Sequence, residues 1–145
     1  MSGPAGDAVS GGTPFTWTAR VYWEDTDAGG VVYYANYLRF LERARTEWLR
    51  ARGVMQQRLA VEKGVQFMVL RVEIDYKAAA RLDDLLAITC EMRHDTRTTA
   101  VFAQRVWREP ATADAQRELL ADAVVRAVCV DAKTLRPRRI AEHIS

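Results

Sequence analysis

The sequence contains only two cysteines and two histidines among its 145 residues, which limits both redox and metal chemistry. Cys90 and Cys129 lie in apolar, strand-like runs without a CxxC partner. Neither cysteine has the spacing to His94 or His143 that a zinc site requires. We therefore predict reduced cysteines in the protein core and no metal site. Because reduced cysteines are typical of a reducing compartment, the sequence favours a cytoplasmic location.

Long hydrophobic runs are also absent. The longest candidate, Ala121 to Val130, is interrupted by Asp122 and Arg126 and falls short of the roughly 18 to 20 apolar residues that cross a bilayer. This predicts a soluble protein without a membrane span. Residues 1–13 hold half of the eight glycines and lack both the basic start and the apolar run of a secretory signal. They predict a disordered tail, which leaves residues 14–145 as a single domain.

Neither sign of charge dominates the chain. The formal net charge is +2, and most Lys and Arg residues are interleaved with Asp and Glu. A nucleic-acid-binding protein gathers basic residues on one face, so we expect no nucleic-acid partner. One run without acidic residues, KTLRPRR at 133–139, is either part of a site for a phosphorylated ligand or a solvated terminal segment.

Hydrophobic periodicity predicts one long helix and five strands. An alternating pattern over 15–23 predicts the first strand, and Asn36 is placed to cap a helix that Gly53 ends. A shorter helix is predicted at 55–62, and further alternating patterns predict strands at 68–76, 86–92, 100–108 and 119–131. The long helix carries an apolar stripe made of Tyr37, Phe40, Leu41, Ala44, Trp48 and Leu49.

A helix that is apolar over a broad face needs a sheet to cover it, which indicates the α+β class. The short polar connections between the last strands favour antiparallel pairing. A five-stranded antiparallel sheet curled around the single long helix fits these elements, and so do other α+β arrangements.

The loop between the first strand and the helix is the segment richest in chemical groups. It places Glu24, Asp25 and Asp27 before Gly29 and Gly30 and then enters a helix. A helix start offers unpaired N–H groups that can hold a developing oxyanion, and a carboxylate beside them suits acyl transfer. The same residue types are also ordinary in loops and caps.

Two other chemical interpretations of this loop fail. Counted from Asp25, an EF-hand would need an oxygen ligand at position five and Glu at position twelve, where Gly29 and Asn36 stand. An aspartate-nucleophile phosphatase, which would use magnesium, needs a parallel α/β chain with several later helices, and the predicted elements do not supply one.

The segment EDTDAGGVVYYANYLRFLERARTEWLR resembles the signature of the 4-hydroxybenzoyl-CoA thioesterase family of hotdog proteins. It is most similar to the branch of bacterial acyl-CoA thioesterases associated with the Tol–Pal system. The likeness continues through YKAAARLDD (76–84), FAQRV (102–106) and VVRAVCVDAKTLRPRRI (124–140), and covers about residues 18–140. The resemblance implies the hotdog fold, a five-stranded curved antiparallel sheet wrapped around one long helix.

The resemblance also implies residue roles. Asp27 matches the family's catalytic carboxylate, acting either as nucleophile or as general base, and Tyr34 matches the residue whose backbone N–H polarises the thioester carbonyl. Gly30 shapes the turn, and Val31 and Tyr33 join it in contacting the substrate. The reaction hydrolyses acyl-CoA or acyl-carrier-protein thioesters without a cofactor, in homodimers or homotetramers whose sheets join edge to edge and whose sites lie between subunits.

Several details refine this expectation. Relatives in the Tol–Pal branch often have histidine where Tyr34 stands, which bears on substrate preference more than on activity. A second hotdog subfamily uses a helix glutamate, but Glu42 and Glu47 are interpreted here as surface residues paired with helix arginines. Asp25 is the structural member of the carboxylate pair. Hotdog dehydratases rely on a histidine, which the loop lacks.

Coenzyme A carries phosphates, so a basic rim is expected around the site. Its candidates are Arg97 and Thr98 at a predicted hairpin and Arg136 and Arg138 in the basic run, with Lys133 and Arg139 beside them. Tyr22, Trp23 and Tyr33 either line the acyl pocket or belong to the core. The rival functions are a weakly catalytic module that binds acyl carrier protein or an envelope-system partner, and a magnesium phosphotransferase.

Overall fold

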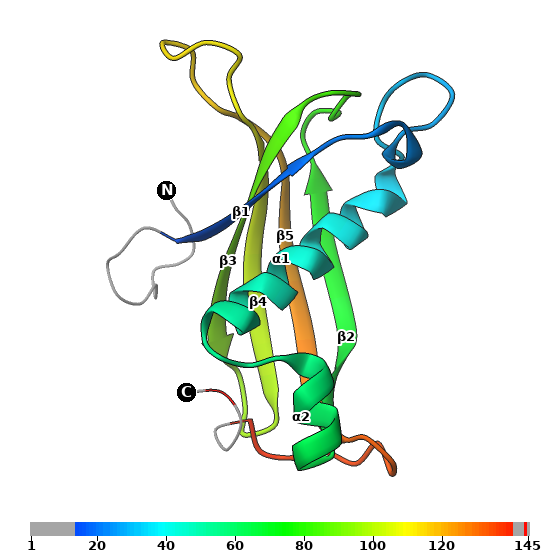
Figure 1. The fold of residues 1–145 in the computed structure, drawn as a ribbon, viewed down its shortest axis with the longest axis vertical. Helices are drawn as coiled ribbons and strands as arrows, with labels where there is room; N and C mark the ends of the chain where they lie inside the picture. Colours follow the sequence, from blue (N-terminus) through cyan, green and yellow to red (C-terminus); the bar gives the residue numbers. More distant parts are fainter. Residues whose placement is uncertain (1–13, 141–143, 145) are drawn as a thin grey trace.

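A computed structural model describes residues 14–140 and residue 144, apart from the side chain of His94. The predicted tail at 1–13 lies outside the described residues. Five strands form one antiparallel sheet in the order β1-β3-β4-β5-β2 (Figure 1). The strands are β1 (Phe15–Arg20), β2 (Val65–Tyr76), β3 (Leu85–His94), β4 (Thr99–Arg108) and β5 (Glu118–Asp131).

The long helix α1 (Tyr37–Ala51) lies across one face of this sheet, and the short helix α2 (Gln56–Lys63) leads from it into β2 (Figure 1). The arrangement confirms the predicted fold, a curved five-stranded antiparallel sheet around one long helix. Among the described residues, no helix has both the length and the apolar character needed to cross a bilayer.

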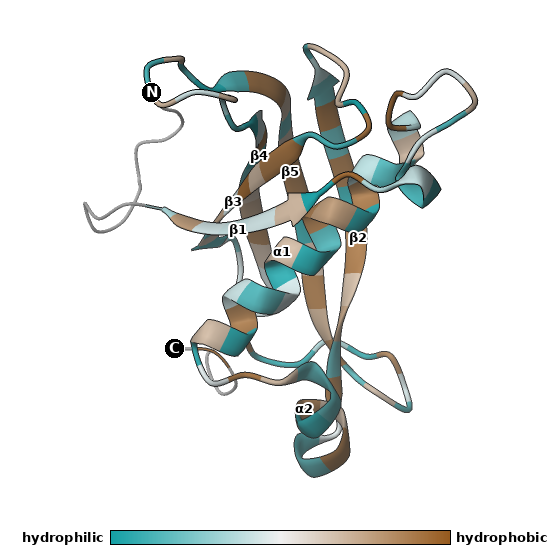
Figure 2. Ribbon diagram, turned by 45° about the horizontal axis from the view of Figure 1, so that its top comes forward, coloured by the Kyte–Doolittle hydropathy of each residue, from teal (hydrophilic) through white to brown (hydrophobic). Residues whose placement is uncertain are grey.

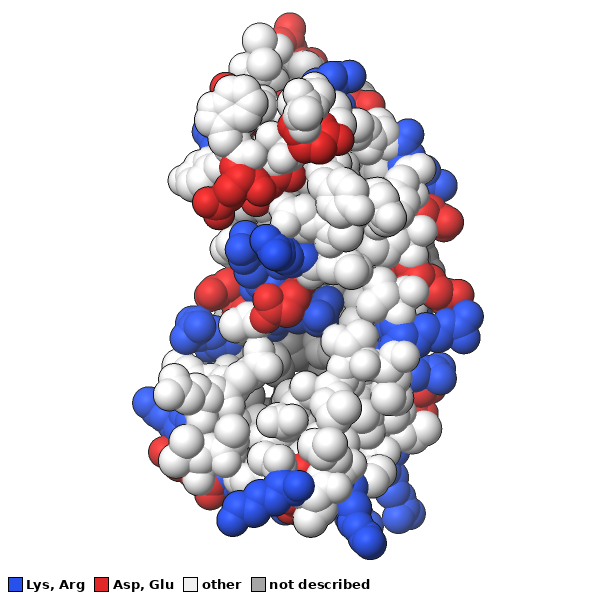
Figure 3. Space-filling view, turned by 90° about the vertical axis from the view of Figure 1, so that its right-hand side faces the viewer, with Lys and Arg blue, Asp and Glu red and all other residues white. Residues whose placement is uncertain are grey.

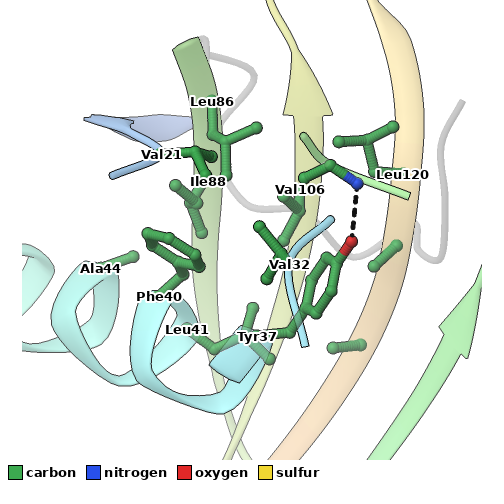
Figure 4. Close-up of a cluster of buried hydrophobic side chains, with 13 residues drawn as sticks. Val21, Val32, Tyr37, Phe40, Leu41, Ala44, Leu86, Ile88, Val106 and Leu120 are labelled. Atoms are coloured by element: carbon green, nitrogen blue, oxygen red, sulfur yellow. Dashed lines mark hydrogen bonds between the residues drawn. The ribbon is translucent and has the colours of Figure 1, made fainter. Parts of the chain in front are cut away.

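The core lies between α1 and the sheet. Every residue of the predicted apolar stripe of α1 is buried, which confirms the stripe. Figure 2 shows the apolar segments of β4 and β5 behind the helix, and Figure 4 shows Phe40 and Leu41 facing Ile88 and Val106 of the sheet. Polar contacts also join the layers, because the buried Gln104 donates from Nε2 to the Leu41 carbonyl at 3.0 Å and accepts at Oε1 from the Arg45 guanidinium at 3.1 Å.

The ends of the helices follow the predicted chemistry in part. Gly53 has φ +83°, the left-handed conformation that ends a helix without strain at glycine, as predicted. Asn36 stands at the position before α1, but its side chain makes no capping hydrogen bond there. The predicted side-chain cap is therefore wrong, and the amide is used elsewhere.

The first strand is shorter than predicted. Backbone pairing with β3 ends at Arg20, although the alternating pattern continues to residue 23. Residues Trp23–Asp25 instead form a 3₁₀ turn that starts the carboxylate-rich loop.

Candidate active site

The loop that carries the carboxylates is a tight backbone hairpin. Thr26 bridges to Val32, the Asp27 N–H donates to the Val31 carbonyl at 2.9 Å, and the Gly30 N–H donates to the Asp27 carbonyl at 3.1 Å. Gly30 has φ +80°, a conformation that glycine adopts readily and other residues rarely do. The glycine therefore sets the turn that presents Asp27.

A second segment, residues 77–84, supports this hairpin from behind. The Val32 N–H donates to the Ala80 carbonyl at 2.8 Å, and the Leu82 N–H donates to the Gly30 carbonyl at 3.1 Å. Ala80 is completely buried, and its N–H donates to the Tyr37 hydroxyl at 2.9 Å (Figure 4). The hairpin is thus held by the 77–84 segment, and this segment is in turn held by Tyr37 of α1.

Arg108 at the end of β4 anchors the supporting segment. Its guanidinium donates to the Ala79 carbonyl at 3.1 Å, to the Asp84 carboxylate, and to the Glu118 carboxylate at 2.8 Å. The hydrogen bonds to Glu118 and Asp84 raise the pKa of Arg108 above its ordinary value, so the group stays charged at any working pH.

The two aspartates of the loop have different surroundings. Asp25 is buried, and its carboxylate accepts hydrogen bonds from the Tyr22 N–H at 2.8 Å and from Nδ2 of Asn36 at 3.0 Å. This confirms the structural role predicted for Asp25. It also explains why the Asn36 amide does not cap α1.

Asp27 is exposed, and its Oδ1 accepts a hydrogen bond from the Gly29 N–H at 2.8 Å. In the part of the chain that the structure describes, no salt bridge engages this carboxylate. It lines an open groove of about 410 Å³. The other lining residues are Glu24, Asp25, Thr26, Tyr33, Ala35, Asn36 and Arg39. Acidic side chains gather toward this end of the molecule (Figure 3).

The helical segment begins beside this groove. A 3₁₀ turn over Tyr34–Asn36 runs directly into α1. Within residues 14–140, the N–H groups of Tyr34 and Ala35 donate to no backbone acceptor outside the turn, as expected at a helix start. Tyr33 precedes the turn in an extended conformation with φ −63° and ψ 134°. Unpaired donors and an exposed carboxylate that accepts one backbone hydrogen bond therefore lie in adjacent parts of one loop.

Aromatic side chains surround the helix start. The Tyr33 and Tyr34 rings lie 4.8 Å apart, and a hydrogen bond with the Tyr34 side chain raises the pKa of Tyr33. The Tyr76 ring meets Tyr34 edge-on at 6.3 Å, and its hydroxyl donates to the Tyr34 carbonyl at 3.0 Å. Tyr22, Trp23 and Tyr33 are exposed, so of the two predicted alternatives the core location does not hold.

The candidates for coenzyme A phosphates lie at the other end of the sheet. Arg97 and Thr98 form the turn between β3 and β4, and Arg136 and Arg138 follow β5. The basic run turns back beside the start of β2, where the Ala132 N–H donates to the Gly64 carbonyl. Eleven residue steps of β2 separate that end from Tyr76, which corresponds to about 36 Å at about 3.3 Å per residue. Within one chain, the predicted coenzyme A contacts therefore lie far from the predicted catalytic residues of the loop.

The remaining predicted residues are placed as follows. Glu47 pairs with Arg50 at 3.2 Å, as predicted, whereas Glu42 accepts a hydrogen bond from the Thr46 hydroxyl at 3.1 Å. Both cysteines are buried, and burial raises the pKa of Cys90 to about 12. Among residues 14–140 and 144, no group of three or more His, Cys, Asp or Glu side chains is placed to hold a metal ion.

Two residues of the site were missed from the sequence. Arg39 of α1 is exposed and lines the Asp27 groove, although it is not among the predicted site residues. Tyr76 ends a predicted strand and opens the YKAAARLDD segment, and its hydroxyl reaches the helix start. Arg39 lies four residues, about one helical turn, after Ala35, which was the available signal for Arg39; the signal for Tyr76 was its place in a segment that resembles the family.

Comparison with known proteins places the chain in a family. The profile of the Thioesterase superfamily matches residues 29–114, and the chain belongs to this superfamily. The acyl-CoA thioester hydrolase YbgC of Escherichia coli O157:H7 is 46% identical over 132 residues, covering 91% of this chain and 93% of that protein. The acyl-CoA thioesterase YbgC of Haemophilus influenzae is 45% identical over 123 residues, covering 85% of each chain.

Solved structures agree with the fold. A probable thioesterase from Bartonella henselae superposes with a TM-score of 0.76 at 32% identity and covers 88% of this chain and 98% of its own. The 4-hydroxybenzoyl-CoA thioesterase from Pseudomonas sp. strain CBS-3 superposes with a TM-score of 0.78 at 25% identity, covering 89% and 95%. The resemblance inferred from the loop and helix is confirmed.

The contrast between the two aspartates predicts different effects on stability. Asp25→Ala leaves the Tyr22 N–H and the Asn36 amide without an acceptor, so we expect the free energy of unfolding to fall by about 1–3 kcal/mol. Asp27→Ala removes an exposed carboxylate and is expected to change it by less than about 1 kcal/mol. Urea denaturation of both variants measures the difference. Equal losses of unfolding free energy in the two variants would show that the Asp25 hydrogen bonds do not stabilise the loop.

Proposed function

We propose that the protein hydrolyses acyl-CoA thioesters at the Asp27 groove. The observation that carries this proposal is a solvent-accessible carboxylate, engaged by one backbone N–H, beside the unpaired donors of a helix start. The relatives named as acyl-CoA thioester hydrolases, which match over most of their length, support the same substrate class.

The chemistry needs a nucleophile or base on one side of the thioester carbonyl and hydrogen-bond donors on the other. Asp27 either attacks the carbonyl carbon to give a mixed anhydride, which water then hydrolyses, or takes a proton from the attacking water. By both routes the hydroxyl of water ends on the acyl carbon, the C–S bond breaks and the thiolate leaves with a proton. The products are a free acid and coenzyme A.

The Tyr34 N–H is the donor that we assign to the developing oxyanion. It opens the helical segment, so the partial positive charge of the helix start adds to its effect. Gly30 sets the turn before it, while Val31 and Tyr33 connect this turn to the helix. In this assignment the backbone of Tyr34 acts on the carbonyl and its ring contributes only to the pocket wall.

We further propose that the active form is a dimer joined through β2. This strand is an edge of the sheet, and several of its apolar side chains are exposed. They are Met68, Val69, Leu70, Val72 and Tyr76. An exposed, long, apolar edge strand is a template for pairing with another chain, so a second copy of β2 is the partner that fits it.

Antiparallel pairing of two β2 strands would also complete the site. The Val65 end of one strand would lie beside the Tyr76 end of the other, which brings the basic end of one subunit toward the Asp27 groove of its partner. We therefore assign the phosphates of coenzyme A to Arg97, Thr98, Arg136 and Arg138 of the partner subunit. An acyl carrier protein presents its thioester on the same pantetheine arm, and the same groove would accept it.

Asp27→Asn tests the catalytic assignment. The substitution keeps the size of the side chain but removes its charge, so we expect the rate of thiol release from a panel of acyl-CoA esters to fall at least about a hundredfold. Detection of the free thiol measures the rate, and thermal melting checks that folding is intact. Comparable turnover by the variant would move the chemistry to another residue.

Tyr34→Pro tests the backbone donor. Proline lacks the N–H, is tolerated at the first position of a helix, and suits the extended conformation of Tyr33. We expect kcat to fall by about 10²–10³, as for the loss of one oxyanion donor. Tyr34→Ala is the matched control, because it shortens the side chain and keeps the N–H. Equal losses in both variants would assign the effect to the ring.

Val69→Lys tests the dimer. A charge on the apolar edge would oppose burial against a second β2, so we expect dissociation to monomers at micromolar concentration and at least a tenfold loss of thiol release, on the order of 1.4 kcal/mol. Val61→Lys makes the same change on α2, where the side chain is 79% exposed, and should alter neither property. Light scattering gives the mass. A fully active Val69→Lys monomer would contradict a site shared between subunits.

A further inference from the structure

Tyr76 makes a contact that its place in the sheet does not require. It is the last residue of β2, and its backbone pairs with Ala121 of β5. Its side chain leaves the sheet and donates a hydrogen bond to the Tyr34 carbonyl at 3.0 Å, 42 residues earlier in the sequence. The ring also meets Tyr37 edge-on, with centroids 5.2 Å apart and planes at 78°. One side chain thus joins the end of β2 to the start of the helical segment.

The bond acts on a peptide group that borders the Asp27 groove. The Tyr34 carbonyl and the Ala35 N–H are opposite ends of one planar amide, so holding the oxygen also fixes the direction of the N–H. A hydrogen bond to the carbonyl polarises the amide and makes its N–H a stronger donor. Ala35 lines the Asp27 groove, and its N–H follows directly after that of Tyr34. The Tyr34 carbonyl also accepts the Tyr37 N–H, so the Tyr76 hydroxyl adds a second hydrogen bond to this amide and does not itself line the groove.

The hydroxyl is suited to a constant role as donor. Partial burial raises the pKa of Tyr76, with smaller contributions from the neighbouring phenols of Tyr37 and Tyr34. The phenol stays protonated throughout the pH range in which a carboxylate-dependent hydrolysis would run. Its partner is a main-chain carbonyl, which does not titrate.

We infer that Tyr76 is a positioning residue, whose hydroxyl holds the Tyr34–Ala35 amide so that the N–H groups of the helix start point at the thioester oxygen. This inference rests on the proposed thioester hydrolysis and extends it to a residue on the edge strand. Because Tyr76 belongs to β2, pairing of that strand with a second subunit would also help to hold the N–H groups of the helix start in place.

Tyr76→Phe is the direct test, since it removes one oxygen atom and keeps the ring. We expect kcat to fall about tenfold, the consequence of losing one hydrogen bond that orients a catalytic donor, while KM stays within about twofold. The amide resonance of Ala35 should shift in NMR spectra, because the Tyr34 carbonyl of the same amide loses the hydrogen bond that polarises it. The amide resonance of Ala44, in the middle of α1, should not shift.

Tyr37→Phe is the comparator for a structural hydroxyl. Its oxygen is buried and accepts the Ala80 N–H, so its removal should lower the melting temperature. Tyr76→Phe should melt close to the wild type. A Tyr76→Phe enzyme whose loss of activity follows a drop in melting temperature, or whose kcat and Ala35 resonance are unchanged, would overturn the inference.

Asp27→Asn, assayed beside it, separates the two proposals. An inactive Asp27→Asn with a fully active Tyr76→Phe would refute only the positioning role. A fully active Asp27→Asn would refute the proposed catalytic carboxylate, and the Ala35 resonance would then still report whether Tyr76 orders the amide.

Discussion

The buried Asp25 carboxylate is the contact on which the site depends. It holds the Tyr22 N–H, where β1 has just ended, and the Asn36 amide, where the helix begins. Both oxygens are used, and the residue is only 7% exposed. Because the two ends of the intervening loop are fixed to one carboxylate, the hairpin between them has a defined position, and Asp27 at its turn is presented to solvent.

Other parts of the chain reinforce the same loop, and they coincide with the segments that carry the family resemblance. The segment at 76–84 supplies the Tyr76 hydroxyl, the Ala80 backbone and the Asp84 carboxylate, which reaches Arg108. The segment at 102–106 supplies Gln104, which donates to a carbonyl of α1. Residues distant in sequence therefore converge on the position of one helix start. This convergence gives a physical reason for the resemblance at 76–84 and 102–106, whose residues take no direct part in the proposed reaction.

Local patterns predicted the parts of the fold that local physics determines. The stripe of α1 and the positions of strands β2 to β5 follow from periods of 3.6 and 2, and Gly53 follows from its backbone freedom. The early end of β1 was not predictable in this way, because a buried carboxylate further along the chain folds residues 23–25 into a turn. Asn36 likewise had the right position and an unexpected partner. The role of Tyr76 needs a contact across 42 residues, which local periodicity does not reveal, although Tyr76 opens a segment that resembles the family.

The central claim is that the thioester carbonyl lies between the Asp27 carboxylate and the Tyr34 N–H. A crystal structure with an acyl-CoA analogue, in which a ketone methylene replaces the sulfur, measures both distances. We predict about 3–3.5 Å from the carboxylate to the carbonyl carbon and about 2.7–3.1 Å from the Tyr34 nitrogen to the carbonyl oxygen. An analogue bound in the protein with its carbonyl beyond the reach of Asp27 would contradict the claim.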